Sequence, residues 1–221
     1  MFVYGGQAEG QTESIMIITS IEVNKNTKSM ARVYLDDNTS FCLPLKRISI
    51  LDLYVNKNLT PETLEFILTY EVYDAAKGAA VNYLALRLRT SSEIKMKLSE
   101  LGYDEEIINK VIENLDEISY IDDYQYAVKY IKEKTKLQPK SIKMLSMELS
   151  YKGISDDIIS SAFEEVVLDE NSIAFELIRK RFSKQTSFDE KTIHKMRSFL
   201  ANRGFNYHQI SKAISKFLPE D

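Results

Sequence analysis

The chain has 221 residues, enough for one or two compact domains, and its 44% hydrophobic and 28% charged content indicates a soluble folded protein. The net charge of −4 argues against a protein that coats nucleic acid by bulk electrostatics. A long uncharged apolar run, a secretory signal and a second cysteine beside Cys42 are all missing, so we expect a cytoplasmic protein without membrane spans or internal disulfides.

The first part of the chain predicts a small β structure. Residues 1–14 are polar and contain glycine, and we interpret them as a loose terminus. Period-two alternation then predicts a strand from Ile15, and two more strands follow, separated by polar turns and ending at Pro44. We expect this antiparallel meander to pack on a helix, because it is too small to be stable alone. The apolar side of the first strand is predicted to hold Ile15, Ile17, Ile21 and Val23.

A long helix is predicted next. Thr60 is suited to cap it, Pro61 to occupy its first position and Glu62 to complement its dipole. Apolar residues recur at helical spacing from there, and we expect the helix to reach Arg89 with a bend at Gly78. Only helices are predicted after that point.

The most informative feature is an internal repeat. Gly102, Gly153 and Gly204 are spaced at intervals of 51 residues. Each follows a helix end, where a left-handed residue is needed, and each is followed by an apolar residue and then a capping residue. Shared apolar positions predict the buried faces of the helices on either side. These positions hold Ile94, Leu145 and Met196; Leu98, Leu149 and Leu200; Tyr103, Ile154 and Phe205; and Ile108, Ile159 and Ile210.

A third helix precedes each of these helix pairs, over residues 82–89, 124–134 and 172–182. The sequence therefore predicts a mainly α protein with three tandem three-helix repeats in an elongated array, preceded by the β meander and the long linking helix. The expected divisions are residues 1–59 for the N-terminal extension, 60–122 for the linking helix and repeat 1, 123–168 for repeat 2, and 169–221 for repeat 3.

Several short segments of the repeats resemble the RecX family. Residues 85–93 (ALRLRTSSE) with 98–103 (LSELGY) resemble the start of its first repeat, and residues 120–127 (YIDDYQYA) resemble its link into the second. Residues 148–154 (ELSYKGI) and 199–205 (FLANRGF) resemble the helix ends of its second and third repeats. The match spans roughly residues 79–218, with the meander outside it.

The resemblance implies a non-enzymatic regulator of RecA. Members of the family bind the RecA–DNA filament along its groove and dampen its ATPase and strand-exchange activities. The predicted repeat array is compatible with this role, because an extended surface can touch several filament subunits in register. The partner implied is thus the RecA filament, and no cofactor is implied.

We predict that basic residues on or just after the first helix of each repeat form the partner-binding stripe, facing acidic surfaces of the recombinase or DNA phosphates. Each one alone could equally be a solvated basic helix end, where cations complement the helix dipole. The set is Arg87 and Arg89, Lys132 and Lys134, Arg179, Lys180 and Arg181, with Arg197 and Arg203 as weaker candidates.

Enzyme signatures are missing: there is no phosphate loop and no dinucleotide fingerprint. His194 and His208 are too far apart to pair on a metal from one helix. For Asp122 and Asp123 we favour helix capping over cation binding. The tyrosines, Tyr126 and Tyr130 among them, are interpreted as packing residues rather than as a stacking platform for single-stranded DNA.

Two other readings stay open. The chain could bind DNA weakly and without sequence preference through its basic C-terminal repeat, where residues 171–218 hold ten bases and three acids. A helix-turn-helix reader is disfavoured, because the helices after Gly102 and Gly153 begin with acid pairs that phosphates would repel. Periodicity alone would also suit a generic scaffold that binds another protein. We expect a monomer, because no large apolar surface patch is evident.

Overall fold

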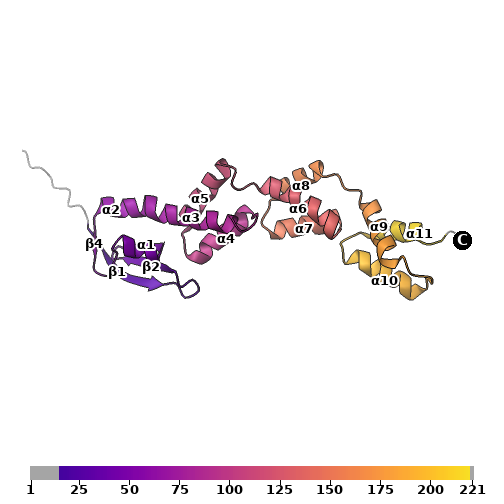
Figure 1. Cartoon of the computed structure of the whole chain (residues 1–221), viewed down its shortest axis with the longest axis horizontal. Helices are drawn as coiled ribbons and strands as arrows, with labels where there is room; N and C mark the ends of the chain where they lie inside the picture. The colour runs from indigo at the N-terminus through magenta and orange to yellow at the C-terminus, as the bar shows by residue number, and fades with distance from the viewer. Residues whose placement is uncertain (1–14, 220–221) are drawn as a thin grey trace, which may run out of the picture. The chain divides into compact units, whose positions relative to one another are not determined.

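The computed structural model describes residues 15–219, which form two compact units. The first unit holds residues up to Arg87 together with 94–118, and the second holds residues 88–93 together with those from Ser119 onward. The predicted loose terminus, residues 1–14, lies outside the described residues. Figure 1 shows the elements along the chain, with strands confined to its beginning and helices after them.

The first unit opens with a four-stranded antiparallel sheet in the order β3-β2-β1-β4. The three predicted strands are confirmed, and a short fourth strand, β4, pairs with the start of β1. Ala31, Val33 and Leu43 lie on the covered face and are fully buried. The elements are β1 (Met16–Val23), β2 (Met30–Leu35), β3 (Ser40–Pro44), α1 (Leu45–Ile50) and β4 (Asn58–Leu59).

The buried side of β1 differs from the prediction. Pairing with β2 shifts register between Ile18 and Ser20, which is a β-bulge. A bulge inserts one residue, so the alternation before it is out of phase with the alternation after it, and Ile18 faces buried Leu35 while Ile21 faces buried Val33. Ile18 is therefore fully buried, whereas Ile15 is 54% and Ile17 38% exposed.

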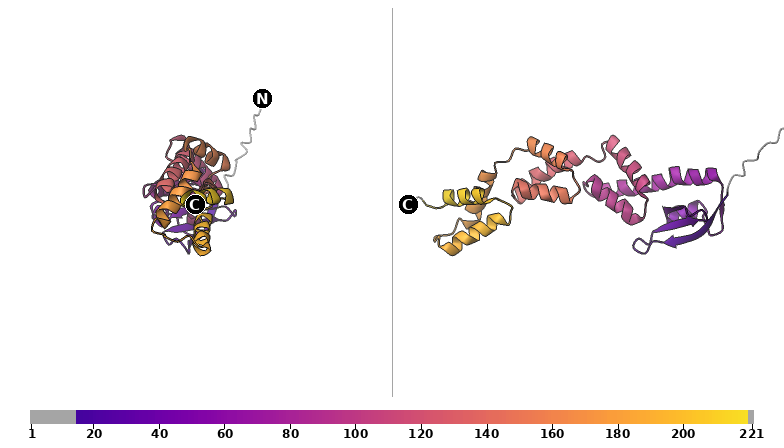
Figure 2. Two further views of the ribbon diagram at one scale, coloured as in Figure 1. Left: turned by 90° about the vertical axis from the view of Figure 1, so that its right-hand side faces the viewer. Right: turned by 180° about the vertical axis from the view of Figure 1, so that it is seen from behind.

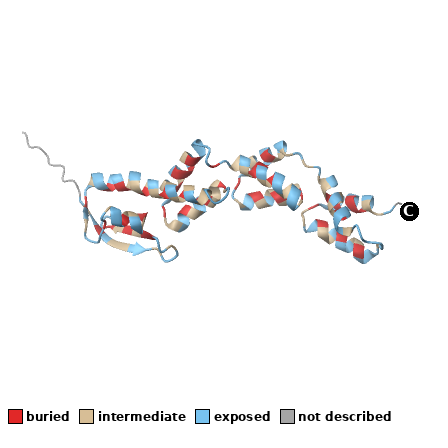
Figure 3. Ribbon diagram, in the orientation of Figure 1, coloured by how far each residue is buried: buried red, intermediate tan, exposed pale blue. Residues whose placement is uncertain are grey.

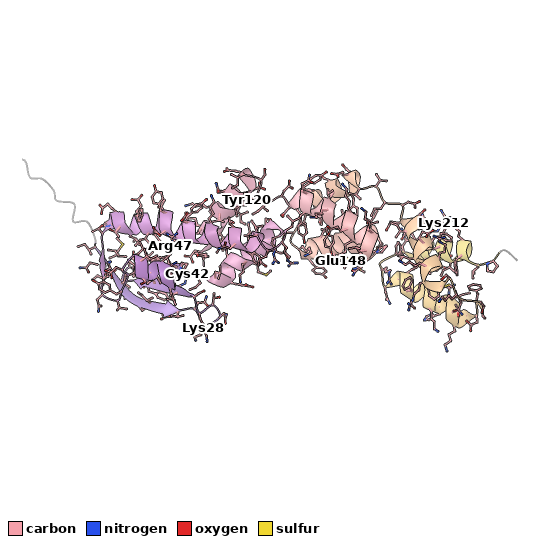
Figure 4. The ribbon with its side chains drawn as sticks, in the orientation of Figure 1. Lys28, Cys42, Arg47, Tyr120, Glu148 and Lys212 are labelled. Atoms are coloured by element: carbon pink, nitrogen blue, oxygen red, sulfur yellow. The ribbon has the colours of Figure 1, made fainter. Side chains whose placement is uncertain are left out.

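The predicted long helix begins where expected, because the Thr60 hydroxyl accepts a hydrogen bond from the Thr63 N–H over 3.3 Å. It runs through α2 (Pro61–Phe66), a π-helical segment η1 (Ile67–Val72) and α3 (Tyr73–Leu84). The helix thus ends at Leu84 and not at Arg89, and its irregular segment precedes Gly78. Arg47 of α1, labelled in Figure 4, binds Glu71 and Asp74 of this helix and ties the sheet region to it.

Three-helix repeats follow, and their predicted cores are confirmed. The equivalent residues Leu98, Leu149 and Leu200 are each fully buried, and so are Ile94 and its counterparts. Buried positions recur along one side of each helix in Figure 3, and Figure 2 shows the second and third repeats from two further directions. The helices are α3, α4 (Ser91–Leu101) and α5 (Glu105–Glu117); α6 (Asp123–Leu137), α7 (Ile142–Tyr151) and α8 (Asp156–Glu165); and α9 (Glu170–Phe182), α10 (Glu190–Ala201) and α11 (Tyr207–Phe217).

The capping predictions hold with one exception. Thr90 and Glu93 form a capping box, each accepting the other's backbone N–H over 3.1 Å. Asn206 forms a second box with Gln209. Asp104 occupies the N-cap position of α5 without a side-chain cap, because its carboxylate receives Arg32 of β2 at 3.3 Å instead.

Candidate functional site

The repeat glycines are where neighbouring parts of the chain meet. Gly102, Gly153 and Gly204 all have positive φ angles, as predicted for helix ends. A backbone carbonyl in each of these turns also accepts a hydrogen bond from a residue earlier in the chain. The Gly102 carbonyl accepts from Arg32, the Lys152 carbonyl from the Thr90 hydroxyl over 2.7 Å, and the Arg203 carbonyl from the Ser141 N–H over 3.0 Å. The glycines therefore serve as joints as well as helix stops.

A carboxylate reinforces the joints within the second unit. Asp123, in the first turn of α6, accepts hydrogen bonds from the N–H and hydroxyl of Ser91 at 2.9 and 2.6 Å. Glu170, in the first turn of α9, accepts from the Ile142 N–H at 2.8 Å. Asp122 caps its own helix through the Gln125 N–H. Capping is confirmed for the acid pair, although Asp123 caps α4 of the preceding repeat rather than α6.

An open groove, which we call the junction groove, lies at the joint where the Ser141 N–H binds the Arg203 carbonyl. It consists of two adjoining hollows of about 900 and 640 Å³, lined by the end of α6 and the α6–α7 loop on one side and by α9 and α10 on the other. The hollows share Leu137, Pro139, Leu177 and Lys180. The predicted residues Lys180, Arg181 and Arg203 line the larger hollow, and Arg179 lines the smaller one.

Partners within the chain hold several of the groove cations in place. Lys140 binds Glu148 of α7, which is labelled in Figure 4, and the Tyr130 hydroxyl donates to the same carboxylate. Burial raises the pKa of Glu148, but the hydrogen bonds from Lys140 and Tyr130 outweigh it, so the pKa lies below its ordinary value and the group stays ionised. Arg203 stacks on the Phe199 ring at 3.9 Å from its centroid and donates to the Phe199 carbonyl.

The apolar floor of the groove was not predicted from the sequence. Leu137, the last residue of α6, is 79% exposed, and it lies beside half-buried Leu177 and Pro139. Whether Leu137 is exposed depends on how the end of α6 packs beside α9, and this tertiary packing cannot be predicted from local sequence patterns. A leucine just before the Gln138-Pro139 helix stop, flanked by Lys136 and Lys140, was the only local signal.

The other predicted site residues lie elsewhere. Arg87 is exposed after α3. Arg89 is largely buried, with a side chain 10% exposed and a contact to Glu93 at 3.7 Å. Lys132 pairs with Glu165 at 2.7 Å, and Lys134 lies over the Tyr130 ring. Arg197 is exposed on α10 and does not line the groove.

The chemistry available in this part of the molecule is ionic and apolar. Within residues 15–219, no group of three or more His, Cys, Asp or Glu side chains is placed to hold a metal ion. Across the same residues, no helix is long and apolar enough to cross a membrane. Tyr126 and Tyr130 pack against the core of the second repeat, in line with their interpretation as packing residues.

Known proteins resemble the chain in sequence and in fold. Models of the first and third three-helix domains of RecX match residues 76–115 and 169–214. Regulatory protein RecX of Clostridium acetobutylicum is 32% identical over 210 residues, covering 92% of this chain and 97% of that protein. Its namesake in Clostridioides difficile is 30% identical over 207 residues, covering 93% and 97%.

Solved structures agree with this. A crystal structure of regulatory protein RecX has the same fold at a TM-score of 0.61 and 23% identity, covering 90% of this chain and 99% of that one. RecX from Lactobacillus salivarius gives a TM-score of 0.58 at 27% identity, over 65% of this chain and 95% of that one. The relatives carry the name of a regulatory protein rather than of an enzyme. The chain belongs to the RecX family of regulatory proteins.

Proposed function

We propose that this protein is a non-enzymatic regulator of RecA, which binds the RecA–DNA filament along its groove and lowers its ATPase and strand-exchange activities. The observation that carries the proposal is the junction groove, which gathers Lys180, Arg181 and Arg203 on one surface of a RecX-family chain. Binding alone can produce the effect, provided that the protein prefers one state of the filament over another.

The proposal includes the organisation of the chain and the place where it acts. We propose that residues 1–59 form an N-terminal extension, residues 60–122 the linking helix with the first repeat, residues 123–168 the second repeat and residues 169–221 the third. The starts of α6 at Asp123 and of α9 at Glu170 support the two inner divisions. The protein is proposed to act as a monomer in the cytoplasm, where the filament forms.

The test is the rate of single-stranded-DNA-dependent ATP hydrolysis by the cognate RecA, with increasing amounts of this protein. We expect the rate to fall. The double variant Lys180→Glu with Arg181→Glu should require at least about tenfold more protein for half-inhibition. The reason is that losing one charge-assisted contact costs about 1.5–3 kcal/mol, and 1.4 kcal/mol is a factor of ten.

A matched control is available on the same repeat. Lys191 and Lys195 of α10 are exposed and lie outside the groove, so Lys191→Glu with Lys195→Glu makes the same change in net charge. Equal loss of inhibition in both double variants would point to bulk charge instead of the groove. Unchanged hydrolysis, with filament binding undetectable by co-sedimentation, would refute the proposal.

Direct DNA binding is the second candidate function, favoured by exposed Lys212 and Lys216 on α11. It would be sequence-independent and would weaken steeply with added salt, because each phosphate contact releases counterions. Binding to bare single-stranded DNA over a salt series, without RecA, tests it. If inhibition of RecA disappears with the same salt slope as DNA binding, then masking of DNA explains the effect.

A further inference from the structure

The charge on the junction groove selects an anionic occupant. Its lining carries six cationic side chains and a single carboxylate, Glu176, which is itself paired with Arg179 at 2.5 Å. Lys140 is likewise paired with the ionised Glu148 carboxylate, so the charge that a ligand can meet lies mainly on Lys180, Arg181 and Arg203. Arg203 is held in place on the Phe199 ring and needs little further ordering. The cations that line the groove are Lys136, Lys140, Arg179, Lys180, Arg181 and Arg203.

The floor of the groove selects an apolar group as well. Leu137 is 79% exposed, and Pro139, Leu177 and Ile173 adjoin it in the two hollows. An apolar base ringed by polar and charged groups is the usual arrangement of a site that buries an anchoring side chain of its partner. Phosphate recognition alone would not need this aliphatic surface.

The same lining disfavours nucleic acid as the occupant. Single-stranded DNA and RNA bind on open aromatic faces, where bases stack. Phe199 is the aromatic residue in the groove, and its ring is covered by the Arg203 guanidinium and contacted edge-on by Phe182 at 5.9 Å. Its face is therefore already occupied, whereas the aliphatic side chains are accessible.

We infer that the junction groove binds an acidic polypeptide segment that carries one large aliphatic side chain. That side chain seats on Leu137 and Leu177, and the neighbouring carboxylates meet Lys180, Arg181 and Arg203. The inference names the partner chemistry at the site of the proposed function and rests on it.

The probe is a short fluorescein-labelled peptide of glutamates around a single leucine, titrated with the full-length protein and followed by fluorescence anisotropy. A second peptide has serine in place of the leucine, and a third probe is oligothymidylate. We expect the leucine peptide to bind roughly tenfold more tightly than the serine peptide, because a buried leucine contributes about that much. Oligothymidylate is expected to bind more weakly than the leucine peptide at physiological salt.

Two variants locate the effect. Leu137→Ser should abolish the preference for the leucine peptide, and its high exposure leaves folding intact, as circular dichroism would check. Val167→Ser replaces an apolar residue that is 87% exposed and lies outside the groove, and it should retain the preference.

The inference is overturned by equal affinity for the two peptides, by a preference that survives Leu137→Ser, or by tighter binding of oligothymidylate. RecA is absent from all of these measurements. A negative result with the peptides would therefore refute this inference without bearing on the proposed regulation of RecA. If Lys180→Glu with Arg181→Glu weakens inhibition of RecA while the peptides bind equally, the groove contacts the filament by charge alone.

Discussion

Gly153 and Gly204 combine an unusual backbone conformation with an unusually close neighbour. Their φ angles are +78° and +86°, a region in which a Cβ atom is strained. A Cβ on Gly153 would lie 2.2 Å from the Ser92 side chain, and one on Gly204 would lie 2.4 Å from the Ser141 hydroxyl. Serine residues of the preceding repeat thus occupy the space that any larger residue would need.

Gly153→Ala and Gly204→Ala should each lower the free energy of unfolding by about 2 kcal/mol or more, from the strained φ and from the displaced serine together. Gly78→Ala is the control, because Gly78 lies within α3 with no atom within 4 Å of its added Cβ. That change should raise stability by roughly 0.5–1 kcal/mol. Urea unfolding of the three variants measures the expected loss of stability at Gly153 and Gly204 and the expected gain at Gly78. Equal effects at all three positions would contradict the close contacts.

Among the helices, α4 begins at a joint where Asp123 of the next repeat accepts hydrogen bonds from the N–H and hydroxyl of Ser91. Asp123→Ala should cost about 0.5–2 kcal/mol and expose the Ser91 N–H, because the carboxylate that caps α4 is lost. Hydrogen exchange of the Ser91 amide should accelerate in this variant. Asp116→Ala removes an exposed carboxylate of α5 and should leave that amide unchanged. If the Ser91 amide exchanges equally in both variants, Asp123 does not cap α4.

Helices and strands were predictable from the sequence where local patterns decide them. The glycine turns, the Thr60 cap and the buried leucines follow from spacing and capping chemistry, and the structure confirms them. The buried side of β1 did not follow, because the bulge near Thr19 is set by pairing with β2. The apolar floor of the groove could not be predicted either, because Leu137 forms part of it only through the position of the end of α6 beside α9.

At the scale of the whole molecule, apolar burial and the links between repeats are separate. The second and third repeats each have a core cluster of their own, one centred on Leu145 and Leu149 and the other on Met196 and Leu200. The bonds between these two repeats, by contrast, are the hydrogen bonds of Ser141, Ile142 and Glu170. Such an arrangement makes stability a sum of repeat terms and interface terms.

Matched core truncations would reveal this division. Leu149→Ala and Leu200→Ala remove the same fully buried position from two repeats, and each should cost about 2–5 kcal/mol. We expect native-state hydrogen exchange to accelerate mainly in the helices of the truncated repeat, with a smaller effect on its neighbour. Uniform acceleration over α6–α11 in both variants would show that the two repeats open as one unit.

The joints also limit how such a chain can lengthen by gene duplication. Before α4 and α7, a hydroxyl residue caps the helix and meets the next glycine turn. The position 51 residues after Ser141 holds Thr192, which lies buried inside α10. At the other end, Arg32 and Cys42 of the sheet already occupy the Gly102 turn. A repeat added at either end would therefore lack a partner for its joint. An internal copy of the second repeat would carry both parts of the joint, the capping hydroxyl residue and the glycine turn.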